Sequence, residues 1–164
     1  MTTNQIKKEL ARRTGLNTSQ IKIKTTGNYE TVYNIKLCNM SYNIDELERV
    51  AREMLESIDR DERTGEILAG GNTYVFVEYD SAAYEAAYNV NDKILEKFEE
   101  KAKNTPAGCL TELFDNLLIM KKSWGELAIH DEENRKTRYI SPQHLGVTLL
   151  KMGKWQQVSQ LILN

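Results

Sequence analysis

The feature that most constrains the fold is an apolar stripe in residues 44–58. Apolar side chains recur there every three or four positions, and charged side chains fill most of the positions between them. This spacing predicts an amphipathic helix that must bury one face against the rest of the chain. Asn43 precedes the stripe and Glu46 follows three residues later, a pattern typical of a helix N-terminus. The stripe consists of Ile44, Leu47, Val50, Ala51, Met54, Leu55 and Ile58.

Three segments around this stripe have the composition of strands. Residues 21–25 and 31–37 alternate apolar with polar side chains, and the turn signal Gly27-Asn28 between them predicts a hairpin. Residues 73–79 are rich in β-branched and aromatic side chains, so they predict a third strand.

Helices are expected on both sides of these strands. The first begins near Thr3 and ends at Gly15, because glycine takes the left-handed conformation of a helix C-terminus without steric cost. The last runs from about Ser81 to about Lys103. Together the elements predict an α-β-β-α-β-α N-terminal unit with a small antiparallel sheet, and the fold class is α+β.

A break in the helical pattern divides the chain. Residues 104–108 contain Pro106 and Gly108 and form the one convincing linker. We therefore expect an α+β domain over residues 1–104 and a C-terminal subdomain over residues 105–164, packed on the first.

The C-terminal part is predicted to be mainly helical with one hairpin. Leucine and methionine side chains in residues 110–120 follow helical spacing. Residues 127–129 and 137–140 flank a polar turn and predict the hairpin. Pro142 favours the start of a further helix, because its fixed φ suits the first turn.

The residues that most often carry chemistry are few and widely spaced. His130 and His144 lack the spacing of paired metal ligands. Cys109 lies near an expected helix start, but no histidine is near it in the sequence to act as a base. Gly70-Gly71 precedes a strand and predicts a turn rather than a phosphate-binding loop. We therefore expect a protein that is not an enzyme and that needs no cofactor or metal.

The chain also lacks the apolar segments of membrane and secreted proteins. Its apolar runs are short, and residues 1–8 do not have the apolar stretch of a secretory signal. We expect a cytoplasmic protein that makes no contact with a membrane, and its oligomeric state is left open.

Basic residues are concentrated near the N-terminus. Residues 1–42 hold seven Lys and Arg against two acidic residues, a net charge of +5 in a chain whose total is −2. Such a surface predicts, as one alternative, a nucleic-acid-binding accessory module that contacts phosphates. Opposite charges that face each other or water would explain the same distribution. The predicted nucleic-acid-binding residues are Lys7, Lys8, Arg12, Arg13, Lys22, Lys24 and Lys36.

Acidic residues follow in the middle of the chain. Residues 43–72 hold nine Asp and Glu against four Arg, a net charge of −5. Several of them belong to the solvent side of the amphipathic helix, where they could present a phosphate-like surface to the basic cleft of a protein partner. The predicted partner-binding residues are Asp45, Glu46, Glu48, Glu53 and Glu56.

The first half of the chain resembles a known family. A helix, two strands and a helix over residues 6–58 are followed by Thr64-Gly65-Glu66-Ile67 and then by Gly70-Gly71-Asn72-Thr73. This arrangement is similar to the large polyvalent protein-associated domains, which are small modules of phage and conjugative-element proteins. The resemblance supplies no catalytic residues.

The resemblance implies a mobile-element origin. Accessory proteins of phages and plasmids of this size often block a host defence system by occupying its nucleic-acid or partner surface. The inference from the resemblance to such a role is an analogy with the family. The leading prediction is therefore a non-catalytic interaction protein, a counter-defence inhibitor such as an anti-CRISPR-type protein. Its expected partner is a host-defence or mobile-element protein.

Overall fold

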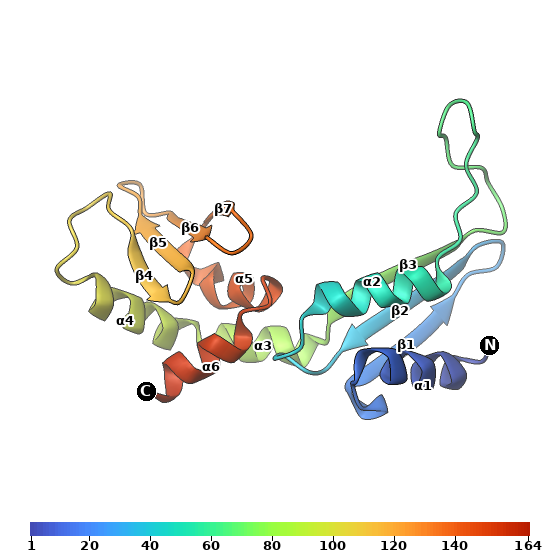
Figure 1. The fold of residues 1–164 in the computed structure, drawn as a ribbon, viewed down its shortest axis with the longest axis horizontal. Coiled ribbons are helices and arrows are strands. Elements are labelled where there is room, and N and C mark those ends of the chain that lie inside the picture. The colour runs from blue at the N-terminus through green and yellow to red at the C-terminus, as the bar shows by residue number, and fades with distance from the viewer. The chain divides into compact units, whose positions relative to one another are not determined.

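The computed structural model describes residues 1–164, which form two compact units, Met1–Ala83 and Tyr84–Asn164 (Figure 1). The division therefore falls earlier in the chain than the linker at residues 104–108. The reason is that Ile94 and Phe98 are buried on a helix that packs against the C-terminal strands and helices. None of the helices is both long and apolar enough to span a bilayer.

The first unit has its elements in the order α-β-β-α-β. A 3₁₀ turn, η1 (Thr18–Gln20), joins the first helix to the first strand. Thr2 caps the first helix and Gly15 ends it in the left-handed conformation with φ 75°. The helices and strands of this unit are α1 (Thr3–Thr14), β1 (Ile21–Thr26), β2 (Thr31–Leu37), α2 (Ile44–Leu55) and β3 (Thr73–Tyr79).

The three strands form one sheet in the order β1-β2-β3. β1 and β2 pair antiparallel as a hairpin, whereas β2 and β3 pair parallel. The predicted small antiparallel sheet is therefore wrong in its third strand, and the sheet is mixed. A helix between two neighbouring strands carries the chain back to the starting edge, so β3 enters in the same direction as β2.

Both helices of the first unit cover the same face of this sheet. Ile35 and Val75 on that face are buried, and they pack beneath α1 and α2. Tyr79 is fully buried there, and its hydroxyl donates to the Tyr42 carbonyl over 2.9 Å. α2 contributes the predicted apolar stripe as far as Leu55, and Leu47 and Ala51 in it are completely buried. The helix ends at Leu55, so Ile58 of the predicted stripe lies outside it.

The second unit combines helices with a four-stranded sheet. Its helices are α3 (Ser81–Asn89), which begins just before the division, α4 (Asn91–Ala102), α5 (Leu145–Lys151) and α6 (Trp155–Leu163), with a 3₁₀ turn η2 (Pro142–His144). The strands pair antiparallel in the order β4-β5-β6-β7. They are β4 (Thr111–Phe114), β5 (Leu117–Lys121), β6 (Leu127–Asp131) and β7 (Lys136–Ile140).

The predicted mainly helical C-terminal part with one hairpin is wrong. β6 and β7 form the predicted hairpin, but residues 110–120 form β4 and β5 instead of a helix. Leu113 and Leu117 are both buried, and they lie on neighbouring strands joined by a tight turn. Asn116 in that turn has a φ of 66°, a left-handed conformation that a helix interior does not contain. Apolar residues four positions apart across a short turn thus imitate helical spacing.

The predicted long helix from Ser81 to Lys103 is interrupted at Val90. Asn91, the first residue of α4, is buried, and its side chain bonds two groups of the C-terminal segment. Nδ2 donates to the Pro142 carbonyl over 3.1 Å, and Oδ1 accepts from the Gly146 N–H over 2.7 Å. Because a buried amide must have partners for both its donor and its acceptor, Asn91 holds the start of α4 against η2 and α5.

Candidate functional site

One face of the three-stranded sheet carries basic and aromatic side chains and is not covered by α1 or α2. The pairing register aligns Lys24 with Asn34, and Asn34 with Phe76, so these three form a row across the strands. Phe76 is 55% exposed, although it is a large apolar side chain in a strand. We call this surface the open sheet face, and none of its residues is buried; it consists of Lys22, Lys24, Thr26, Val32, Asn34, Lys36, Tyr74, Phe76 and Glu78.

Three lysines surround a shallow hollow of about 330 Å³ on the open sheet face. Lys22 Nζ lies 3.1 Å from Asp80 Oδ1, and Lys36 Nζ lies 3.2 Å from Glu78 Oε1. Lys24 has no ion pair, so its ammonium group is available to an anion. The alternation of side chains along β1 and β2, with Lys22 opposite Lys36, places the three lysines on one face.

The ion pair between Lys22 and Asp80 shifts both groups toward their charged forms. The hydrogen bond from Lys22 lowers the pKa of the Asp80 carboxyl, and the same bond raises the pKa of Lys22. Both residues therefore stay charged at neutral pH. Because Lys22 is largely exposed, an incoming phosphate can compete with Asp80 for it.

The basic residues of α1 do not join the open sheet face. α1 packs on the covered face of the sheet through Ile6 and Leu10, so its outer side points away from the lysines of the hairpin. Arg12 and Arg13 both bond Glu9 at 2.7 Å, which lowers the pKa of Glu9 to about 2. The seven predicted nucleic-acid-binding residues thus form two separate groups. Lys22, Lys24 and Lys36 are in one group, and Lys7, Lys8, Arg12 and Arg13 are in the other.

The predicted acidic surface on α2 contains two arginines that pair with most of its carboxylates. Arg49 bonds both Glu46 and Glu53 at 2.7 Å. Arg52 bonds Glu48 at 2.8 Å and Glu56 at 2.6 Å. These pairs follow from the i,i+3 and i,i+4 spacing of opposite charges on a helix, a signal already visible in the sequence. Asp45, in the first turn, is the one predicted acid without an ion pair.

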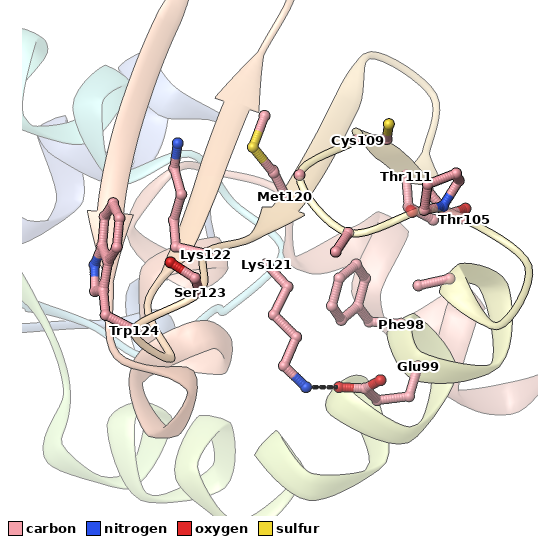
Figure 2. Close-up of a pocket in the computed structure, with 14 residues that line it drawn as sticks. Phe98, Glu99, Thr105, Cys109, Thr111, Met120, Lys121, Lys122, Ser123 and Trp124 are labelled. Atoms are coloured by element: carbon pink, nitrogen blue, oxygen red, sulfur yellow. Dashed lines mark hydrogen bonds and ion pairs between the residues drawn. The ribbon is translucent and has the colours of Figure 1, made fainter.

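A cavity of about 910 Å³ in the second unit was not predicted from the sequence (Figure 2). It is bounded by the end of α4, the loop before β4, the end of β5 and the turn that follows. Phe98 and Met120 line it, and Lys121 bonds Glu99 at 3.1 Å across its lower side in Figure 2. A helix was predicted for residues 110–120, and a helix has no strand edge. The cavity lies at the edge formed by β4 and β5, so it was not expected from the sequence.

Aromatic and cationic side chains meet at one end of this cavity. Lys122 Nζ lies 5.7 Å from the ring centre of Trp124 and 5.8 Å from that of Tyr139. Trp124 is 66% exposed, and its Nε1–H donates to Glu126 over 2.6 Å. Lys122 itself has no carboxylate partner, so its charge is balanced only by the faces of the two rings.

Cys109 lies exposed on the rim of the cavity, but neither histidine accompanies it. His130 Nδ1 lies 2.9 Å from the Thr137 hydroxyl on β7, and His144 packs edge-on against Tyr88. Neither ring lines the cavity, so the arrangement does not form a thiol–imidazole pair. No group of three or more His, Cys, Asp or Glu side chains lies close enough together to hold a metal ion.

The segment that carries the family resemblance forms a loop closed by a buried amide. Asn72 is 2% exposed, and its Oδ1 accepts from the Asp59 N–H over 2.7 Å while its Nδ2 donates to the Leu68 carbonyl over 2.6 Å. Asn72 therefore has a structural role in this segment. Comparison of the chain with protein-family models, curated proteins and solved structures gave no match, and the family resemblance stays a prediction.

Proposed function

We propose that this protein binds single-stranded nucleic acid across the open sheet face. The observation that carries the proposal is the row of Lys24, Asn34 and Phe76, in which an unpaired cation and an exposed aromatic ring flank a neutral amide. Lys24 and Phe76 are on the two outer strands of the sheet, so a bound chain that crosses the face can meet both.

Each residue of this row matches one part of a nucleotide. A base from a single strand can stack on the exposed Phe76 ring, because every base has a flat π face. The Lys24 ammonium can contact a phosphate, and the Asn34 amide offers both a donor and an acceptor to a base edge. Tyr74 lies two residues before Phe76 on the same face of β3, is partly exposed and provides a second ring.

The distribution of charge favours a single strand over a duplex. The second unit ends in a helix–glycine–helix segment, but its Lys154 is 5% exposed and bonds Glu133 at 2.9 Å. That lysine is thus not available to a duplex backbone. In the first unit the lysines of the open sheet face lie beside exposed aromatic rings. Bases of a single strand can stack on these rings, whereas bases of a duplex are already stacked on one another.

The sequence-based prediction of an inhibitor that binds a protein through the acidic surface of α2 has less support. Arg49 and Arg52 pair with four of its five carboxylates, so a basic cleft would have to displace them. The mobile-element origin and the counter-defence role stay predictions.

The proposal is tested by fluorescence anisotropy with labelled single-stranded DNA and RNA of about 12 nucleotides, beside the matching duplexes. We expect binding to the single strands that weakens as salt rises, because phosphate contacts release counterions. Absence of binding to either single strand at low salt, or equal binding to the duplexes, would contradict the proposal.

A further inference from the structure

The cavity of the second unit lies against a strand edge that has no partner. β5 continues to Lys121, which pairs with Leu127 of β6, whereas β4 begins only at Thr111, opposite Ile119. If β4 extended backward in the same register, Cys109 would stand opposite Lys121. Cys109 instead donates its N–H to the Pro106 carbonyl over 3.1 Å, in a turn. The chain leaves the sheet at this point, and the cavity opens in its place.

The backbone of Lys121 is directed toward this gap. Lys122 N–H donates to the Glu126 carbonyl over 2.8 Å, so Lys122 faces β6, and its neighbour Lys121 faces the other way. No backbone group bonds Lys121 from the side of β4. One N–H and one C=O are therefore free for an added extended chain, as at other open sheet edges.

The side chains beside this edge differ on the two faces of the strand. On one face Lys121 extends toward Glu99 and Phe98, and on the other Met120 and Lys122 point away from them (Figure 2). Phe98, Ala102 and Pro106 give the cavity an apolar part, beside the Lys121–Glu99 ion pair. The second face carries the Lys122 ammonium, which has no carboxylate partner.

We propose that this cavity binds an extended segment of a partner protein in which an apolar residue is followed or preceded by an acidic one. Adjacent residues of a strand point to opposite faces, so one apolar side chain fills the space beside Phe98 while its neighbour's carboxylate meets Lys122. The segment's backbone bonds Lys121, and Trp124 covers the ion pair from the solvent side. The site is in the second unit and does not depend on nucleic-acid binding by the first.

The proposal is tested with a library of random peptides displayed on phage and selected on the full-length protein. We expect enriched peptides to contain an apolar residue next to Asp or Glu, and N-methylation of the peptide residue that pairs with Lys121 to abolish binding. Lys122→Glu should weaken binding of the selected peptide at least about tenfold. A peptide in which the acidic residue is replaced by Lys should bind the Lys122→Glu variant with restored affinity. The matched control is Lys93→Glu, an exposed lysine of α4 that does not line the cavity, which should leave the affinity unchanged.

A second measurement locates the peptide without a substitution. Cys109 is exposed on the cavity rim, so a bound peptide should slow its alkylation by iodoacetamide, while alkylation of Cys38 in the first unit stays unchanged. The proposal is overturned if no peptide is enriched, if the enriched peptides bind Lys122→Glu as well as the parent, or if Cys109 is alkylated at the same rate with and without peptide.

Discussion

The side-chain amide of Asn72 donates to Glu30 Oε1 over 3.3 Å and so joins the loop before β3 to the turn of the β1–β2 hairpin. Gly70 N–H donates to the same carboxylate oxygen over 2.9 Å, and Gly71 N–H donates to the Tyr29 carbonyl over 2.9 Å. Figure 1 shows this loop extending beyond the end of α2. The hydrogen bonds at its base hold it against the hairpin, beside the first residues of β2 and β3.

Replacement of Asn72 should destabilise the first unit. Asn72→Ala removes the partners of the Asp59 N–H and the Leu68 carbonyl at a buried site, and we expect a loss of about 2 kcal/mol in the free energy of unfolding. Urea unfolding measures the loss. Asn28→Ala is the control, since Asn28 is exposed in the hairpin turn and makes no side-chain hydrogen bond there; equal stability of the two variants would contradict the role of Asn72.

Gly146 should be intolerant of the smallest side chain, although alanine usually stabilises a helix relative to glycine. A Cβ at Gly146 would lie 2.5 Å from the Ala87 carbonyl oxygen of α3, which is too close for a nonbonded contact. We expect Gly146→Ala to lower the free energy of unfolding by about 2 kcal/mol because helices α3 and α5 must separate. Gln156→Ala, an exposed position of α6, should change it little in the same thermal or urea unfolding experiment. A stabilised Gly146→Ala variant would show that the two helices do not approach this closely.

The sequence predicted well the elements in which one period repeats over the whole element, and also the β6–β7 hairpin, which has a polar turn between its two strands. The stripe from Ile44 to Leu55 and the alternation in residues 21–25 and 31–37 contain enough repeats to indicate a single period in each element. β4 and β5 are short, with the turn at Asn116 between them, so neither contains enough repeats to distinguish a strand from a helix.

The candidate site was predictable only in part for a related reason. Alternation within β1 and β2 brings Lys22, Lys24 and Lys36 to one face, but the place of Phe76 beside them depends on the parallel pairing of β2 and β3 across α2. Local patterns do not determine which strand pairs with which. The ion pairs on α2 needed no tertiary information, because Glu46 and Glu53 stand three and four residues from Arg49.

The buried ion pair between Lys154 and Asp131 should make the second unit sensitive to acid. Burial raises the pKa of the Asp131 carboxyl, but hydrogen bonds from Asn134 and the charge of Lys154 outweigh it, and the pKa is lowered. A carboxyl with a lowered pKa stabilises the fold above its ordinary value of 3.8, and this contribution is lost as the pH falls from there through the folded-state pKa. Asp131→Asn should therefore reduce the loss of stability between about pH 5 and pH 2 in urea unfolding.

The same pair predicts the effect of removing its cation. Lys154→Met leaves the Asp131 carboxylate, 2% exposed, without its charged partner, and we expect a loss of about 3 kcal/mol at neutral pH. The double variant with Asp131→Asn should recover part of that loss, because no unpaired charge remains buried. Additive losses in the double variant would show that the two side chains do not interact.

Removal of Lys24 should weaken nucleic-acid binding and its dependence on salt together. Lys24 is the cation of the open sheet face without a carboxylate partner, so Lys24→Ala loses one phosphate contact. Affinity should then fall less steeply with salt: the negative slope of log affinity against log salt should become smaller in magnitude by about 0.7 for a single strand. Lys8→Ala, on the outer side of α1, is the matched control and should leave the slope unchanged. If both variants change the slope equally, the binding is a general effect of positive charge.

Removal of Phe76 separates base stacking from charge. Phe76→Ala leaves every charge in place, and because the ring is 55% exposed it should change the stability of the fold little. We expect the affinity for a single strand to fall by about 5- to 150-fold, which corresponds to the roughly 1–3 kcal/mol of one stacked base, with the salt dependence unchanged. Tyr88→Ala, which removes an exposed ring from α3, is the control for loss of an aromatic surface. The measurement is anisotropy with the same labelled oligonucleotides, and an unchanged affinity of Phe76→Ala would mean that nucleic acid does not bind on this face of the sheet.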